Sequence, residues 1–439
     1  MLVDKKSWLA VSPLLVFLVV YLLSSVLAGD FYKVPVTAAF LVASAYAILI
    51  THSSEDGGSR LDMDGRIAIF SRGAGDGNVL LMIWIFVLAG AFAATAKEIG
   101  AIDATVAMTL KILPARFLYA GLFLAACFIS MAIGTSVGTI VALVPVATGL
   151  AQEVGAGVPL VTAIVVGGAF FGDNLSFISD TTIASTQALG CKLKDKFRAN
   201  VKIAIPAVLA VLAIYMIIGF SGSAEVQNES VDYIKLLPYL AVIVLALFGV
   251  NVLLILGIGL AMTFASGLLS EGIPAGEWLL AAWNGVKGMT MVICVSLLAA
   301  GIFYIFKRIG WMDAITAFLS RRLKGPKGAE FGIAALVSVA NAITANNTVA
   351  IISCSDISRE LTKRFDLEPR KVASILDTFS CLVQGILPYG AQILMASSMA
   401  QISPGSIIPG LYYPFALGIS AVLGILIGKA GRKTEPSSN

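Results

Sequence analysis

Charged residues are scarce in this sequence. Asp, Glu, Lys and Arg make up 13% of the 439 residues, against about 25% in a typical soluble protein. Hydrophobic residues make up 58%, and the mean hydropathy is +0.92. Apolar runs near the length of about 20 residues that a helix needs to cross a hydrocarbon core recur along the chain. The composition therefore excludes an ordinary soluble domain and predicts an all-α polytopic membrane protein with about 10–12 membrane segments.

Several kinds of functional motif are also missing. The sequence has one histidine, His52, and five cysteines that lack metal-ligand spacing. It has no P-loop and none of the kinase, hydrolase or zinc motifs, which predicts a protein that is not an enzyme, has no cofactor and uses ion gradients rather than ATP. The net charge of +4 comes from basic residues in short loops and implies no nucleic-acid partner.

The most informative stretch is GGAFFGDNLSFISDTTI, which runs from Gly167 to Ile183 and contains Asp173 and Asp180. An ionisable residue at membrane depth usually faces a cavity, a partner or a transported ion. In a continuous helix the two aspartates would share one face. They predict an ion site at 167–183. The alternative is that they cap helices at the bilayer surface, and it is stronger for Asp180, which directly precedes two threonines.

Three segments recur with nearly the same spacing. Residues 98–104, EIGAIDA, return as RIGWMDA at 308–314, a displacement of 210 residues. Residues 130–142 then fall opposite 340–352, and the stretch DNLSFISDTT falls opposite VQGILPYGAQ with one residue of slippage. Three matches in register predict an internal duplication.

Charge asymmetry predicts that the two halves have opposite orientations. The basic stretches 191–202 and 358–371 should be cytoplasmic loops, whereas 222–233 has no Lys or Arg and should lie outside. Counting crossings from a cytoplasmic N-terminus places the 98–104 motif outside and the 308–314 motif inside. Inverted repeats of this kind are typical of secondary transporters.

The predicted organisation is a first repeat at 1–220, an external linker at 221–236, a second repeat at 237–430 and a cytoplasmic tail at 431–439. The apolar runs expected to cross the membrane are 8–28, 34–50, 79–96, 201–220, 237–248, 252–269, 290–306 and 408–427.

Within each half, small polar residues interrupt an expected crossing. These are AIGTSVGT at 132–139 and AITANNTV at 342–349. Non-helical backbone at this depth is tolerated only where it is buried or lines a water-filled cavity, so both segments are predicted to be re-entrant hairpin tips. Their carbonyls and neutral side chains are ligands suited to sodium. The alternative is close helix packing through small residues.

The motif GDNLSFISDTT at Gly172–Thr182, preceded by GTSVGT, resembles the NhaC family of sodium/proton antiporters within the ion transporter superfamily. The family motif reads approximately GD-x-x-S-P-x-S-D-T-T, and the resemblance covers nearly the whole chain in segment order. This sequence departs from it at Asn174, where many members have a basic or imidazole side chain, and at Phe177, where they have proline. The residues that match are Gly172, Asp173, Ser176, Ser179, Asp180, Thr181 and Thr182.

The resemblance implies two hairpin-bearing repeats, a scaffold that often forms a homodimer, and cation/proton antiport. Similar proteins exchange organic acids or carry amino acids, so a coupled carrier of a small organic anion or amino acid is the alternative function. The mechanism of antiport follows from charge. Burial disfavours the ionised form of a carboxylate, whereas a bound cation favours it, so a proton and a sodium ion compete for the same carboxylate. The expected location is the lipid bilayer of the bacterial cytoplasmic membrane, with both termini inside.

The predicted ion or substrate ligands come from both halves. Asp377 and Gln384, in the polar segment 377–394, are the second-half candidates within an apolar run. The predicted sodium ligands are Asp173, Asp180, Thr135, Ser136, Asn346 and Asn347. The full predicted set adds Asn174, Ser176, Ser179, Thr181, Thr139, Thr344, Thr348, Asp377 and Gln384.

Overall fold

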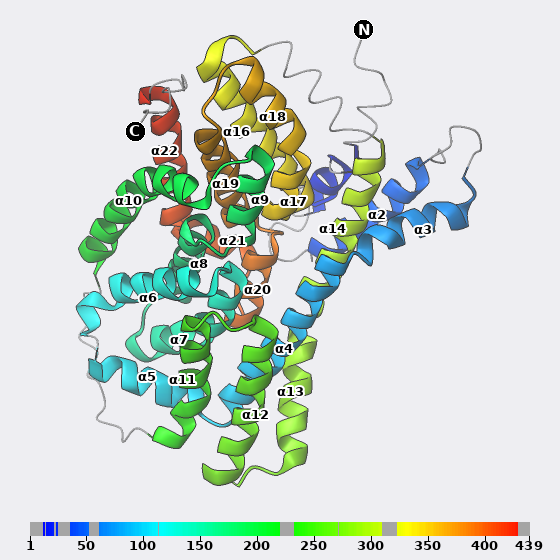
Figure 1. Cartoon of the computed structure of the whole chain (residues 1–439). Coiled ribbons are helices and arrows are strands. Elements are labelled where there is room, and N and C mark those ends of the chain that lie inside the picture. The colour runs from blue at the N-terminus through cyan, green and yellow to red at the C-terminus, as the bar shows by residue number, and fades with distance from the viewer. Residues whose placement is uncertain are drawn as a thin grey trace.

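The computed structural model describes residues 36–51, 61–219 except 113, 232–309 except 271, and 323–428, together with parts of 12–24. Throughout these ranges the regular elements are helices, as the composition predicts (Figure 1). The tail at 431–439 lies wholly and the linker at 221–236 mostly outside the described residues, and the run at 8–28 is described only in part.

The helices before the linker surround the segment that contains Asp173. The buried α8 packs against α6 and α7, and α10 passes along its C-terminal end. In chain order the helices are α2 (Val36–Ile50), α3 (Met63–Ala74), α4 (Gly77–Glu98), α5 (Ala101–Ile112), α6 (Leu118–Ile133), α7 (Ser136–Val154), α8 (Val158–Leu175), α9 (Asp180–Leu189) and α10 (Leu193–Ile218), with a short 3-10 helix at Ala115–Phe117.

The helices after the linker complete the same core. The buried α19 packs against α8, α9, α10 and α16, so that the two buried broken segments lie side by side. These helices are α11 (Tyr233–Leu247), α12 (Val252–Ser270), α13 (Ala275–Gly288), α14 (Thr290–Ile309), α16 (Gly325–Thr344), α17 (Asn347–Ser353), α18 (Ser355–Arg364), α19 (Pro369–Ile386), α20 (Ala391–Ala400), α21 (Pro404–Ile407) and α22 (Tyr412–Ile427), with a 3-10 helix at Ile408–Gly410.

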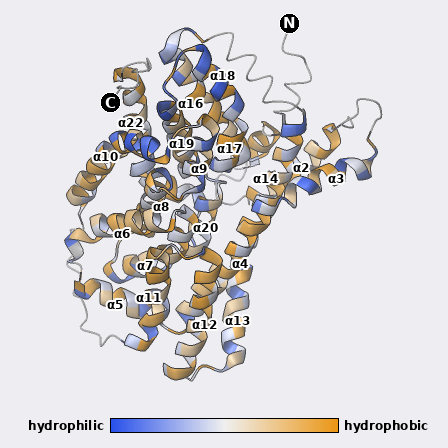
Figure 2. Cartoon of the chain, in the orientation of Figure 1, coloured by the Kyte–Doolittle hydropathy of each residue, from blue (hydrophilic) through white to orange (hydrophobic). Residues whose placement is uncertain are grey.

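Several helices are long and apolar enough to cross a membrane. Within the described residues seven helical stretches meet this condition, and α2, α6 and α11 are shorter apolar helices. Apolar residues cover the outer faces of α4, α10 and α12, whereas hydrophilic residues concentrate on α3 and α18 (Figure 2). This distribution is that of a multi-pass membrane protein, since apolar outer faces suit a lipid environment.

Both predicted basic loops are wrong, because each stretch is mostly helical. Residues 358–371 belong to α18, which ends at Arg364, and to α19, which begins at Pro369, so that 365–368 alone connect the two helices. The basic stretch 191–202 belongs largely to α10, which begins at Leu193 after the extended residue Lys192. Lys196 and Asn200 lie one turn apart on α10, and both are buried in the core. A count of basic residues treats every lysine as solvated. It therefore missed Lys196, which is buried and contacts polar groups. The helices α3 and α13 were also not predicted, because charged residues interrupt their apolar pattern.

Breaks and helix ends recur along the chain with one constant spacing. Left-handed backbone occurs at Gly134 and Ala345, at Gly155 and Asp366, and at Gly190 and Gln401, and each pair is 211 residues apart. The hydrogen bonds of Ser130 Oγ to the Ala169 carbonyl and of Asn341 Nδ2 to the Ser380 carbonyl, at 2.5 and 2.7 Å, have the same spacing. The spacing is one residue longer than the displacement of 210 that the sequence motifs suggested. It supports the predicted duplication, and the inverted orientation of the halves stays a prediction.

Orientation can be tested at two related positions. Lys194 is exposed near the start of α10, and Ser403 lies at the start of α21. If the halves are inverted, single cysteines at these positions, in a variant without native cysteines, lie on opposite sides of the membrane. An impermeant thiol reagent should then label only position 403 in intact cells and both positions in permeabilised cells. Labelling of 194 in intact cells contradicts the inverted topology.

Candidate functional site

The first break joins α6 to α7 beside Asp173. Gly134 ends α6 with φ of 75°, a conformation that glycine adopts without steric cost, and Thr135 is extended before α7 begins. The backbone N–H of Ser136 donates to Asp173 Oδ1 at 2.7 Å. The carboxylate thus pairs with an N–H that has no partner within the helix and lies at the positive end of the α7 dipole.

A close contact between α6 and α8 fixes the position of Asp173. Ser130 Oγ donates to the Ala169 carbonyl at 2.5 Å. A Cβ atom at Gly172 would lie 2.1 Å from Ser130 Oγ, so this position has no room for a larger residue. The backbone of α8 can therefore approach α6 one residue before Asp173.

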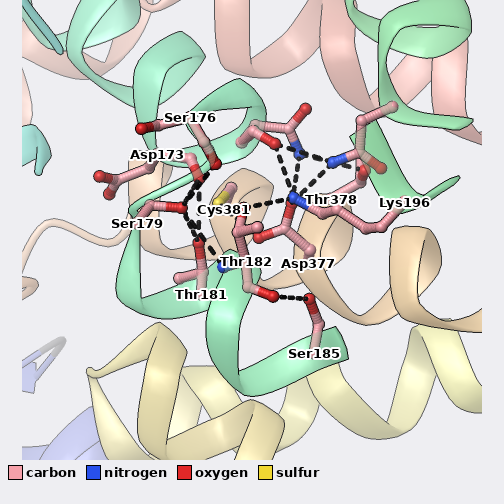
Figure 3. Close-up of polar contacts among 12 residues, drawn as sticks. Asp173, Ser176, Ser179, Thr181, Thr182, Ser185, Lys196, Asp377, Thr378 and Cys381 are labelled. Atoms are coloured by element: carbon pink, nitrogen blue, oxygen red, sulfur yellow. Dashed lines mark hydrogen bonds and ion pairs between the residues drawn. The ribbon is translucent and has the colours of Figure 1, made fainter. Parts of the chain in front are cut away.

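Hydroxyl groups satisfy the carbonyls at the end of α8. Ser179 Oγ and Thr181 Oγ1 donate to the Asp173 carbonyl at 2.7 and 3.0 Å (Figure 3). Ser176 Oγ donates to the carbonyl of Met131 on the neighbouring α6 at 2.9 Å. Ser179 also caps α9 by accepting from the Thr182 N–H. The serines of the motif therefore stabilise the non-helical segment between α8 and α9.

The second break joins α16 to α17. Ala345 has φ of 48°, an uncommon conformation for a residue other than glycine, and Asn346 Oδ1 accepts from the Val349 N–H at 3.0 Å. Gln384 Nε2 donates to the Ala345 carbonyl at 2.9 Å and to Gln392 Oε1 at 2.8 Å. Gln392 Nε2 in turn donates to Ser136 Oγ at 3.1 Å. This chain of amides connects the two breaks.

A cavity of about 690 Å³ lies between the breaks. Asp173, which is 6% exposed, is its most buried acid, and Asp180 and Arg359 are its other charged lining residues. Within the described residues Asp173 makes no ion pair. All six predicted sodium ligands line the cavity, as do the predicted ligands Thr181 and Thr348. The neutral lining also includes Asn78, Gln187 and Gln392.

The remaining predicted ligands lie outside the cavity lining. Thr139 and Thr344 donate to backbone carbonyls within their own breaks, at 3.2 and 2.9 Å. Ser176, Ser179 and Gln384 form the contacts described above. Asn174 and Asp377 meet instead in a second, fully buried polar cluster, where Asn174 Nδ2 donates to Asp377 Oδ2 at 3.1 Å.

Sequence reasoning missed two members of this second cluster. Lys196 Nζ lies 2.6 Å from Asp377 Oδ2, and Asn200 Nδ2 donates to the same oxygen at 2.7 Å. Figure 3 shows the Asp173 carboxylate pointing away from this group. The sequence did contain a signal for these two residues. Lys196 and Asn200 are four residues apart, so they share one face of a helix, and they directly precede an apolar run.

Broken helices that meet around an acidic cavity, within a multi-pass helical protein, define a secondary active transporter. A model of the Na+/H+ antiporter family matches residues 4–220 and 230–432, and the chain therefore belongs to this family. It is a secondary antiporter.

Proteins similar to this chain differ in the substrates that their names state. The malate-2H(+)/Na(+)-lactate antiporter of Bacillus subtilis is 22% identical over 80% of this chain and 82% of its own length. The Na(+)/H(+) antiporter NhaC of Alkalihalophilus pseudofirmus is 20% identical over 79% and 83%, respectively. The arginine/ornithine antiporter ArcD of Halobacterium salinarum is 23% identical over 70% and 69%. The solved YdaH transporter of Alcanivorax borkumensis aligns with a TM-score of 0.48 at 14% identity, over 89% of this chain and 97% of that one.

Proposed function

We propose that the protein exchanges sodium for protons across the cytoplasmic membrane, with Asp173 as the carboxylate for which the two ions compete. One observation carries the proposal. Asp173 is a nearly buried acid without an ion-pair partner in the described residues, and it lies in a cavity formed by both helix breaks. A buried carboxylate in this setting is neutralised either by a proton or by a cation.

The surrounding groups suit a weakly held monovalent cation. Asp173 Oδ1 accepts one backbone N–H, and no ion pair neutralises this carboxylate among the described residues. Thr135, Asn346 and Asn347, each with an oxygen in its side chain, line the same cavity. Ion binding would thus recruit residues from both breaks, and protonation of Asp173 would release the ion. Proton and sodium cannot occupy the carboxylate together, which is the condition for exchange.

A second candidate function is exchange of a small organic anion or amino acid coupled to sodium or protons. The cavity volume of about 690 Å³ exceeds what one hydrated ion needs and falls within the range of small-molecule sites. Arg359, which lines the cavity, donates from Nε and Nη2 to the Ala188 carbonyl at 3.1 and 2.9 Å. Its guanidinium could pair with a substrate carboxylate. The names of two relatives, a malate/lactate antiporter and an arginine/ornithine antiporter, are consistent with this candidate.

Purified protein in liposomes containing a pH-sensitive dye distinguishes the two candidates. An inward sodium gradient alone should drive proton efflux if sodium/proton exchange is the activity. If flux appears only after malate, lactate, arginine or ornithine is added, the organic exchange replaces the first proposal. Protein-free vesicles under the same gradients give the background.

The second break supplies a further prediction. Asn346→Ala and Asn347→Ala each remove an amide that lines the cavity, and each should raise the half-saturating sodium concentration about three- to tenfold, the effect of losing roughly 1 kcal/mol of binding. Sodium-dependent flux in liposomes measures this change. Asn251→Ala, which removes an exposed amide that accepts from the Leu253 N–H at the start of α12, is the matched control and should leave the sodium dependence unchanged. Unchanged values in both cavity variants would leave these amides with a packing role only.

A further inference from the structure

The buried ammonium group of Lys196 has the surroundings of a bound cation. The side chains of Lys196 and Asp377 are 1% and 0% exposed. Lys196 Nζ lies 2.6 Å from Asp377 Oδ2, 2.6 Å from Thr182 Oγ1 and 2.8 Å from the Asn174 carbonyl oxygen. An ammonium has three N–H donors, and each therefore has an acceptor here.

The three acceptors come from three different helices. Asn174 belongs to the last turn of α8, Thr182 to the first turn of α9 and Asp377 to the middle of α19. The Asn174 carbonyl is among those that a helix leaves unpaired at its C-terminal end, where the helix dipole favours a cation. A carboxylate, a helix-end carbonyl and a hydroxyl are also the ligand types by which broken helices bind sodium in transporters.

The rest of the cluster holds two of these three oxygens in place. Asn200 Nδ2 donates to the Asn174 carbonyl at 2.9 Å and to Asp377 Oδ2 at 2.7 Å. Asn174 Nδ2 reaches Asp377 Oδ2 and Thr378 Oγ1 at 3.1 and 3.2 Å. The Asn174 carbonyl and Asp377 Oδ2 therefore have donors other than the lysine.

This cluster is separate from the cavity beside Asp173, although the two share one backbone segment. Asp173 and Asn174 are adjacent, but the Asp173 side chain lines the cavity whereas the Asn174 carbonyl points to Lys196. Lys196, Thr182 and Asp377 are not among the cavity-lining residues.

We propose that these oxygens of Asn174, Thr182 and Asp377 form a second monovalent-cation site, which the Lys196 ammonium occupies permanently as a built-in cation. The site goes beyond the proposed function, because it stands whether or not Asp173 binds sodium. The lysine keeps Asp377 neutralised, so that Asp377 exchanges no ion with solution. Removal of the lysine side chain opens the site to a small cation, and ammonium or methylammonium matches the group removed.

Cation-dependent stability of Lys196→Ala tests the proposal. Thermal unfolding of the purified variant is followed in choline chloride, ammonium chloride and methylammonium chloride at equal ionic strength. The choline ion is too large for the space of one ammonium group. We expect a lower melting temperature than wild type in choline, and a saturable rise of about 3–5 °C in methylammonium, since a ligand bound only to the folded state stabilises it. Wild type and Lys194→Ala, which changes an exposed lysine on the same helix, should show no such difference between the salts.

A double variant makes the result specific to Asp377. Lys196→Ala with Asp377→Leu has no buried charge in the cluster and should melt at one temperature in all three salts. If Lys196→Ala is unstable in choline, it is purified throughout in methylammonium chloride and then exchanged into choline, where it should lose monodispersity. The proposal is overturned if Lys196→Ala responds to the salts as wild type does, if the double variant responds equally, or if the double variant folds while Lys196→Ala folds in none of the salts.

Discussion

Asp173→Asn is expected to reduce sodium-driven proton flux to the level of protein-free vesicles. The substitution keeps the size of the side chain and an oxygen that can accept from the Ser136 N–H. It removes the charge, and an amide can neither release a proton nor neutralise a cation. Dye-reported flux in liposomes, with the amount of reconstituted protein measured in parallel, checks this result.

The control for this variant is Asp103→Asn, which changes an exposed aspartate in the first turn of α5. It should retain wild-type flux. Asp173→Asn protein should also remain monodisperse in detergent, because its packing and its contact with α7 are preserved. Substantial sodium-driven flux through Asp173→Asn would remove this residue from the mechanism.

Asp377→Leu is expected to lower the free energy of unfolding by about 3–5 kcal/mol, the usual cost of leaving one member of a buried ion pair without its partner. Lys196 would remain buried opposite an apolar side chain, and Asn174 and Asn200 would each lose an acceptor. Thermal unfolding in detergent and the amount of protein in membranes report the loss.

Adding Lys196→Met to Asp377→Leu should recover much of this stability, because a neutral apolar pair of similar volume carries no buried charge. Asp356→Leu is the matched control. Its carboxylate pairs with Arg359 at 3.1 Å, but the side chain is 90% exposed, and surface pairs of this kind contribute little. A double variant less stable than Asp377→Leu alone would contradict the ion-pair account of this cluster.

The sequence predicted where the helices break better than it predicted which residues contact one another. Small polar residues within apolar runs identified both interruptions, because glycine, threonine and asparagine are the residues that end and cap helices. The positions of Gly134 and Asn346 follow directly from this chemistry. Asp173 and Asp180 would share one face only if this segment were a continuous helix, and the chain instead leaves the helical conformation from Ser176 to Ser179.

The missing information was which distant residues meet. Asp377 carries the same local signal as Asp173, an acid within an apolar run, and was therefore predicted to have a similar role. Its pairing with Lys196 depends on the packing of α19 against α10, which no local pattern specifies. In the sequence, Lys196 resembled a solvated lysine because it lies in a basic stretch with Lys194 and Arg198, and in the structure those two neighbours are exposed whereas Lys196 is not. Tertiary contacts decide which of these basic residues is buried.

The competition of sodium and proton for Asp173 is tested most directly by the pH dependence of sodium binding. Radioactive sodium binding to the purified protein is measured over a series of pH values, in wild type and in Asp173→Asn. Asp180 and Arg359 are the other charged residues of the cavity among those described. We predict that the half-saturating sodium concentration of wild type rises as the pH falls, approaching tenfold per pH unit once the carboxylate is protonated, and that Asp173→Asn loses this dependence. Sodium affinity that is independent of pH in wild type, or a wild-type pH dependence in Asp173→Asn, would contradict the account.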